Sequence, residues 1–376
     1  REIGDYSFES SPYGDLQLTN ITLNSLLTKI PEGAFKNHMV ENLIIPSSIK
    51  SIMSSAFEQY DFYDHSTLKN LIFEDDSQLT EIGDRAFFAT GMSELSLPSS
   101  VEKIGKDAFT GLEGLTKFTI GPKVRELGDR FLYGKDLREF EVDINNKYFT
   151  VLKGVLYSLD MRTLVKCPDA YYRDYDILNV PLYVKTIKNG AFAGWADYDQ
   201  NTMGITLNLP SNLTTLNIDE NFIAFTVSEI NISGNSSFTS VDGVLFNKNK
   251  TTIYRIPTTF NSDEYTIPNT VNTIYDNFGF SNSRVMTINI PSSVSSIGEK
   301  AFQTDTDYAF ETINLYSNDS LAYDITSFEI VNYGNSGDLQ TKQRTINVKY
   351  EDLKTKIENM YIDSLFTINV NLLEWI

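Results

Sequence analysis

Apolar and polar residues follow one another along this chain in a phrase that returns many times. A typical copy is Ile104-Gly105-Lys106-Asp107-Ala108-Phe109. A short loop follows, and then two apolar residues flank a third residue, as in Phe118-Thr119-Ile120, often close to a proline. The phenylalanines of three copies, Phe87, Phe109 and Phe131, are 22 residues apart, and insertions lengthen other copies. Self-similarity at a spacing of about 20–50 residues predicts a solenoid of stacked repeats.

The apolar-x-apolar step predicts a short strand, because alternate side chains of a strand point to the same face. One strand from each repeat would stack into a parallel sheet, with the Ala-Phe pair on the opposite wall. Phe109 is therefore expected to be buried between neighbouring repeats. The middle residue of each step is expected to point outward, and these residues are Gln17, Ile44, Ile72, Ser96, Thr119, Glu141, Lys166, Asn179, Asn208, Asn231, Arg255, Thr266, Asn289 and Asn314.

Two units of a second kind interrupt the array. Residues 149–157 and 238–246 match position for position at an offset of 89. Each unit has a dipeptide ending in glycine between two apolar runs, Lys153-Gly154 in the first and Asp242-Gly243 in the second. Glycine readily adopts the positive φ of a tight turn, so both units are predicted to be β-hairpins.

The repeat resembles that of the BspA-like group of leucine-rich-repeat proteins. The phrase of that group is similar to Ile-Pro-x-x-Val-x-x-Ile-Gly-x-x-Ala-Phe, and residues 97–109 and 290–302 follow it. The group often has cysteine three residues after the phenylalanine, where this chain has Tyr60, Thr90, Leu112, Trp195 or Asp305. The resemblance implies a surface or secreted protein of a host-associated bacterium. It also implies an adhesive or binding role and no catalytic residues.

We therefore predict a β-rich α/β repeat fold, a right-handed leucine-rich-repeat solenoid over residues 1–330. It would have one short parallel strand per repeat, with β-hairpin insertions. The phrase stops at residues 331–376, where strand-like alternation at 345–350 and 366–370 flanks a segment of helical spacing. This region is predicted to be a C-terminal cap or the start of a following domain. Because the chain begins within a repeat, we expect it to be a fragment of a longer protein.

Composition narrows the class of function. The 376 residues include 31 Lys and Arg and 50 Asp and Glu, which gives a net charge of −19. Such a chain repels phosphate backbones, so nucleic-acid binding is disfavoured. No apolar stretch approaches the roughly 20 residues of a membrane-spanning helix. The single cysteine, Cys167, excludes an internal disulfide and lies at an inward strand position.

No catalytic or metal-binding constellation is recognisable in the sequence. The two histidines, His38 and His65, are expected in solvated loops, without the clustered ligands that zinc requires. Neither a Gly-x-Ser-x-Gly elbow nor a Walker-type phosphate loop occurs. Acidic loops at 197–199 and 305–307 do not continue into a calcium-binding pattern. We therefore expect no enzyme activity, no metal and no cofactor.

Aromatic residues gather with aspartate in three loops that are longer than the repeat needs. Exposed aromatic side chains are enriched at recognition surfaces, although these rings could instead fold back over the edges of the repeats. On the strand face, Ile44 and Ile72 form an apolar spot. The candidate ligand-binding residues are Tyr60, Phe62, Tyr63, Tyr171, Tyr172, Tyr175, Trp195, Tyr198, Ile44 and Ile72.

These patterns predict an extracellular or cell-surface binding and adhesion module. Its concave strand face and aromatic loops would contact a host or extracellular-matrix protein. The alternatives are a carbohydrate-binding solenoid, whose partner would be a glycan, and a structural spacer within a larger surface protein. Nucleic acid and direct membrane insertion are not expected.

Overall fold

The computed structural model describes residues 3–11, 18–59, 68–192, 204–216, 227–257, 259–276, 285–299, 301–302, 311–316, 322–323, 344–348, 354–355, 358 and 366–370. The chain forms two compact units. Unit 1 comprises Arg1–Tyr175, Tyr183–Trp195 and Thr215–Asn217. Unit 2 comprises Asp176–Leu182, Ala196–Thr214 and Ile218–Ile376.

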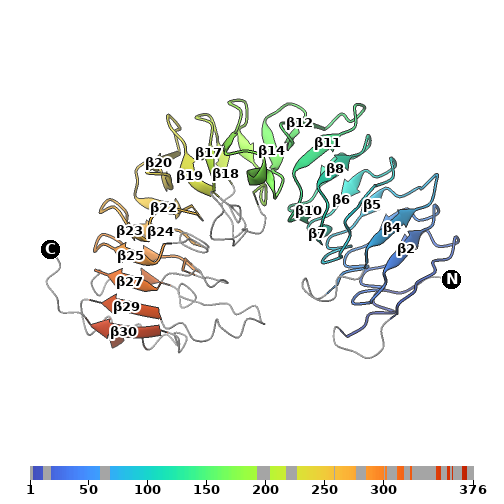
Figure 1. Ribbon diagram of the computed structural model, residues 1–376, viewed down its shortest axis with the longest axis horizontal. Helices are drawn as coiled ribbons and strands as arrows, with labels where there is room; N and C mark the ends of the chain where they lie inside the picture. Colours follow the sequence, from blue (N-terminus) through green and yellow to red (C-terminus); the bar gives the residue numbers. More distant parts are fainter. Residues whose placement is uncertain are drawn as a thin grey trace. The chain divides into compact units, whose positions relative to one another are not determined.

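Most of the predicted apolar-x-apolar strands form a column of short parallel strands, but residues 95–97 form no strand, and the step at 16–18 is only partly within the described residues. In unit 1, β2 (Asn42–Ile45) pairs with β4 (Asn70–Phe73), and β8 (Lys117–Ile120) pairs with β11 (Glu139–Val142) (Figure 1). Their side chains alternate between the core and solvent, which is the pattern of a sheet with one covered face. The predicted solenoid of stacked strands and repeats is therefore confirmed, while its handedness stays a prediction.

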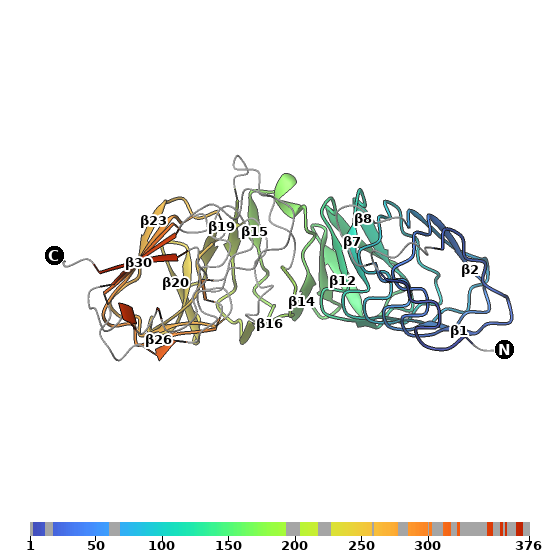
Figure 2. The same ribbon diagram turned by 90° about the horizontal axis from the view of Figure 1, so that it is seen from below.

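A second column of two-residue strands adds to the predicted one. In unit 1 its first five members are β1 (Lys29–Ile30), β3 (Ser51–Ile52), β5 (Glu81–Ile82), β6 (Lys103–Ile104) and β9 (Glu126–Leu127). Each ends at the apolar residue that opens the recurring phrase. A glycine follows β5, β6 and β9 and lets neighbouring repeats approach, since a Cβ on Gly105 would lie 2.5 Å from the backbone nitrogen of Asp84. Figure 2 separates the two columns, with β2 and β1 on different sides of unit 1.

The Ala-Phe pairs form the opposite wall, where phenylalanine rings stack from one repeat to the next. The rings of Phe8, Phe35, Phe57, Phe87 and Phe109 are stacked in sequence, with centroids 5.3–5.5 Å apart. Phe109 is fully buried, as predicted. The core of unit 1 therefore lies between the strand columns and this ring stack.

One repeat departs from the aligned phrase. Leu132, in β10 (Leu132–Gly134), pairs with Phe109 in β7 (Phe109–Leu112), so leucine occupies the phenylalanine position. Phe131 lies one residue earlier and packs against Phe118 and Phe140, with centroids 6.1 and 6.0 Å away. The ring stack thus ends at Phe109, and a cluster of tilted rings continues the core.

The residue before the alanine of the phrase has a left-handed backbone, and in several repeats it forms an ion pair. Arg85 has a φ of 54°. Its guanidinium forms a bidentate ion pair with the buried Glu58 of the preceding repeat, with hydrogen bonds of 2.9 and 3.1 Å. Lys36 lies 3.3 Å from the same carboxylate. Burial raises the pKa of Glu58, but Arg85 and Lys36 hold it, on balance, below its usual 4.5.

This pair gives the stability of unit 1 a defined pH dependence. The pKa of Glu58 is lower in the folded state than in the unfolded chain. The ion pair therefore stabilises the fold fully above the ordinary pKa of Glu58, and this stabilisation is lost as the pH falls through the folded-state pKa. Arg85→Met should therefore lower the melting temperature at about pH 7 and do so far less at about pH 3. Thermal melts of both proteins at the two pH values measure the effect. An equal deficit at both values would contradict it.

The two predicted hairpins are present. In unit 1, β12 (Phe149–Leu152) and β13 (Val155–Ser158) are antiparallel around Lys153 and Gly154, which have φ of 49° and 75°. The next strands of the same sheet are β14 (Thr163–Lys166), β16 (Thr186–Ile187) and β18 (Thr215–Leu216). In unit 2 the equivalent sheet contains β20 (Phe238–Val241), β21 (Val244–Asn247), β22 (Thr252–Arg255), β24 (Thr273–Ile274), β26 (Ser296–Ile297) and β28 (Ala322–Tyr323).

Lys166 and Arg255 do not point outward, so this part of the predicted strand face is wrong. Both residues are buried. The cause is that β14 and β22, which follow the hairpins, pair with the two-residue strands β16 and β24. These two strands therefore belong to the second column, where the residue predicted to be exposed faces protein.

A buried asparagine fixes the start of each hairpin. In unit 1, the Asn146 amide group donates to the carbonyls of Gly121 and Val124, at 2.7 and 2.9 Å. Its carbonyl accepts the backbone N–H groups of Tyr148 and Phe149, at 2.8 and 2.9 Å. In unit 2, Asn235 makes the same four contacts with Ser211, Leu213, Ser237 and Phe238.

Asn146→Ala is expected to lower the free energy of unfolding by about 1–3 kcal/mol, because buried backbone groups lose their partners. Asn145→Ala is the matched control, since its side chain is exposed, and should change stability by less than about 0.5 kcal/mol. Urea unfolding followed by circular dichroism measures both. Equal effects of the two substitutions would show that the four contacts contribute little.

Unit 2 has its own column of longer parallel strands. One sheet contains β15 (Ile177–Asn179), β17 (Ile205–Asn208) and β19 (Val227–Asn231). The other contains β23 (Glu264–Thr266), β25 (Thr287–Ile290), β27 (Thr312–Leu315), β29 (Arg344–Val348) and β30 (Phe366–Val370). The strands predicted near residues 345–350 and 366–370 are thereby confirmed. The division of the chain at residue 330 stays a prediction.

Candidate functional site

The predicted aromatic loop at residues 170–176, called the tyrosine loop below, is held in place from beneath by a buried ion pair. Lys166 Nζ lies 2.6 Å from Asp169 Oδ1, and both side chains are at most 2% exposed. Asp169 also accepts the backbone N–H of Gly134 at 3.1 Å, and the Ala170 N–H donates to the carbonyl of Leu137 at 2.8 Å. Burial raises the pKa of Asp169 to about 6, although Lys166 and the Gly134 N–H oppose the shift. The loop is thus fixed to the repeat below it.

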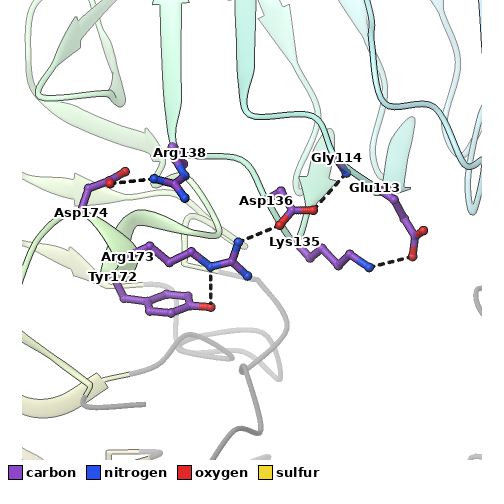
Figure 3. A network of polar contacts seen from close by, with 8 residues as sticks. All are labelled: Glu113, Gly114, Lys135, Asp136, Arg138, Tyr172, Arg173 and Asp174. Atoms are coloured by element: carbon purple, nitrogen blue, oxygen red, sulfur yellow. Dashed lines mark hydrogen bonds and ion pairs between the residues drawn. The ribbon is translucent and has the colours of Figure 1, made fainter. Parts of the chain in front are cut away.

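A network of polar contacts holds the loop at its surface (Figure 3). Arg173 donates to Asp136 at 2.7 Å, and the other oxygen of Asp136 accepts the backbone N–H of Gly114 at 3.0 Å. Arg138 donates to Asp174 at 3.0 Å. Burial raises the pKa of Asp136, but Arg173 and Gly114 hold it, on balance, below its usual value. Exposed pairs stabilise little individually, so the network mainly fixes the direction of the loop.

Sequence reasoning missed this network. The charged residues of the loop lie beside its tyrosines, but their partners Asp136 and Arg138, and the Gly114 N–H that Asp136 accepts, belong to two earlier repeats. Sequence separations of 36 and 37 residues join Arg138 to Asp174 and Asp136 to Arg173. Stacking of the first hairpin on the preceding repeat creates this proximity, which no local pattern records.

The tyrosines of the loop differ in exposure: one is buried, one is partly exposed and one is exposed. Tyr171 lies in the short 3-10 helix Tyr171–Arg173 and is 1% exposed, so its prediction as a contact residue is wrong. It instead covers the edge of the repeat and stacks on Tyr175, with ring centroids 4.5 Å apart. Tyr175 is 40% exposed, and Tyr172, partly exposed, lies beside the Arg173 guanidinium at 5.7 Å. Tyr172 and Tyr175 remain as candidate contacts.

The apolar spot on the strand face is where the sequence places it. Ile44 and Ile72 are paired across β2 and β4 and are 52% and 53% exposed. Beside them, Asn70 donates to Asn42 at 2.7 Å. Adjacent apolar side chains exposed on the surface of a sheet suit contact with a partner. The binding role of this spot stays a prediction.

The other candidate residues, Tyr60, Phe62, Tyr63, Trp195 and Tyr198, lie outside the described residues.

His38 is a buried structural residue, so its prediction as a solvated loop histidine is wrong. Its Nδ1 accepts the Leu18 N–H at 3.1 Å, and its Nε2 contacts the carbonyl oxygen of Phe8. Cys167 is buried as expected, and burial raises the pKa of its thiol, which disfavours the reactive thiolate.

Neither a metal site nor a membrane span is found in the described part of the chain. Within those residues, no three His, Cys, Asp or Glu side chains are grouped to hold a metal ion. The helical residues described there form no helix of the length and apolar character that a membrane crossing requires.

The chain is similar to several solved structures. A leucine-rich repeat protein from Eubacterium ventriosum aligns with a TM-score of 0.50 at 18% identity, over 84% of this chain and 83% of that one. The pneumococcal vaccine antigen PcpA aligns with a TM-score of 0.49 at 18% identity, over 95% of this chain and 88% of that one. A leucine rich cell surface protein from Faecalibacterium prausnitzii aligns with a TM-score of 0.41 at 18% identity, over 86% and 89%.

Comparison of the sequence shows the family. No curated protein matches the chain. The family model for the BspA type leucine rich repeat region matches in six copies, over residues 1–61, 58–152, 170–308 and 258–369. These matches cover most of the chain, including both hairpins' flanking repeats and the strands β29 and β30. The chain therefore belongs to the family of BspA type leucine-rich-repeat proteins.

Proposed function

We propose that this chain is a non-catalytic binding and adhesion module, secreted or displayed at a cell surface, that contacts a host or extracellular-matrix protein. The contact surface in unit 1 comprises two rings of the tyrosine loop, the partly exposed Tyr172 and the exposed Tyr175, and the separate apolar spot of Ile44 and Ile72. The proposal extends to this chain the surface role that its family resemblance implies.

The observation that carries the proposal is the anchoring of the tyrosine loop. The loop departs from the minimal repeat, yet a buried ion pair and two surface ion pairs fix it in one conformation. Tyrosine rings held in this way lose little conformational entropy when they bind, and tyrosine and arginine dominate the energetic centres of protein interfaces.

The proposal predicts that Tyr172→Ala combined with Tyr175→Ala weakens binding to a matrix protein by at least about tenfold. The assay measures binding of the purified chain to immobilised collagen and laminin by biolayer interferometry. Tyr148→Ala is the matched control, because this exposed tyrosine lies outside the loop, and it should bind like the parent chain.

The apolar spot is tested in the same assay. Ile44→Ser combined with Ile72→Ser should weaken binding, while Ile144→Ser, which changes a more exposed isoleucine, should not. Two outcomes contradict the proposal. If the parent chain bound neither collagen nor laminin, a structural spacer would be favoured. If all variants bound equally, the contact would lie outside the tyrosine loop and the apolar spot.

A further inference from the structure

Four consecutive strands of unit 2 present the same two polar residues on one face. Strands β25, β27, β29 and β30 each contain Thr-Ile-Asn followed by a large apolar residue, and they stack in parallel (Figure 1). Their register places the threonines in one file and the asparagines in another. We call this surface the Thr/Asn face, and its residues are Thr287, Asn289, Thr312, Asn314, Thr345, Asn347, Thr367 and Asn369.

The repeat fold does not require this uniformity. The same outward positions of unit 1 are occupied by Ile44 in β2, by Lys117 and Thr119 in β8 and by Glu141 in β11. In a chain with a net charge of −19, none of the eight residues of the Thr/Asn face is charged. Asn289 is buried and the other seven are partly or fully exposed, and Glu264 of β23 lies in register with Thr287 at the edge of the face. An uncharged surface gives neither attraction nor repulsion to an ion, so its complementary partner is neutral.

The asparagines of the face are already ordered by one another. Asn314 donates to Asn289 at 2.7 Å, and Asn347 donates to Asn314 at 2.8 Å. Asn289 in turn donates to Thr266 at 3.0 Å and to Glu264 at 2.6 Å. All these side-chain bonds run in one direction, from the later strand to the earlier one. Since the amides are held before any ligand arrives, binding would lose little side-chain entropy.

Within the ladder Asn314 retains hydrogen-bonding capacity, whereas Asn289 donates to both Glu264 and Thr266. An asparagine amide has two hydrogens and two oxygen lone pairs, and the ladder uses one of each at Asn314. A threonine hydroxyl both donates and accepts. The Thr/Asn face therefore offers a regular lattice of neutral donors and acceptors, one row per strand.

We propose that the Thr/Asn face binds an extended neutral polysaccharide that lies across the strands. Sugar hydroxyls donate and accept hydrogen bonds, as the side chains of the Thr/Asn face do, and they carry no charge. Neighbouring strands are about 4.8 Å apart, close to the advance of one pyranose residue in an extended glycan, whereas an extended polypeptide advances by only about 3.3 Å per residue. This surface lies in unit 2, so it is independent of the protein contact proposed for unit 1.

The test is native gel electrophoresis of the whole chain in gels containing hydroxyethyl cellulose, xylan or mannan. At least one of these polysaccharides should retard the parent chain. Thr312→Val combined with Thr345→Val removes two hydroxyls while keeping β-branched side chains suited to a strand, and should raise the apparent dissociation constant about tenfold. Thr252→Val combined with Thr273→Val is the matched control in the second strand column and should leave retardation unchanged.

Melting temperatures establish that both double variants are folded. The proposal is overturned if none of the three polysaccharides retards the parent, or if both double variants are retarded alike. A further gel contains heparin, a charged polysaccharide. Retardation in this gel alone also overturns the proposal, because the charged ligand would then be bound elsewhere on the chain. Loss of collagen or laminin binding in the Thr312/Thr345 variant, without any polysaccharide binding, would show that the face takes a protein instead.

Discussion

Phe109→Ala is expected to lower the free energy of unfolding by about 3–5 kcal/mol, the range for removing a buried phenylalanine ring. Phe109 is fully buried, its ring stacks on that of Phe87 with centroids 5.4 Å apart, and the tilted ring of Phe118 has its centroid 6.5 Å away. The cavity would lie between two repeats. Because a repeat is stabilised by its neighbours, the loss should reduce the cooperativity of unfolding within unit 1.

Urea unfolding followed by circular dichroism measures this change. Phe8→Ala is the matched control, since Phe8 lies at the end of the same ring stack and is 48% exposed. It should destabilise the chain far less than Phe109→Ala. Similar losses for the two variants would mean that the ring stack does not carry the stability of the solenoid.

Breaking the buried ion pair beneath the tyrosine loop is expected to destabilise the chain by about 3–5 kcal/mol, because the remaining charge is buried without its partner. Lys166→Met leaves the Asp169 carboxylate in this position, and Asp169→Leu leaves the Lys166 ammonium. Replacing both residues together should restore much of the loss, since an apolar pair of similar volume is often tolerated.

A double-mutant cycle on urea unfolding tests this prediction. The expected sign is a coupling free energy that makes the double variant more stable than the sum of the single variants. Losses that simply add would show that the two side chains do not stabilise one another. In that case the tyrosine loop would be held mainly by its surface ion pairs.

The sequence predicts the strand face and the phenylalanine wall because both depend on residues at fixed short spacings. The burial of Phe109 follows from the phrase alone. The second strand column was less visible, because only one apolar residue, such as Ile104, marks each of its strands. Lys166 is wrongly predicted to be exposed for a different reason. Its strand has the same apolar-x-apolar pattern as the first column but pairs with a strand of the second column.

The candidate site was predictable only in outline. The aromatic composition of the tyrosine loop indicates its position, but the burial of Tyr171 depends on the packing of its ring against the repeat edge. The asparagine contacts of Asn146 and Asn235 could have been found, because both lie in segments related by the offset of 89. The network of Arg173 and Asp136 could not, because it joins residues 37 apart.

Binding through the anchored tyrosine loop and the apolar spot is tested most directly by hydrogen–deuterium exchange of the chain, alone and with collagen or laminin, whichever it binds. Slower exchange is expected in residues 170–176 and in β2 and β4, with little change in the phenylalanine wall, at the turn that contains Phe87 and at β7. Protection confined to the phenylalanine wall, or to unit 2, would contradict the proposed contact surface.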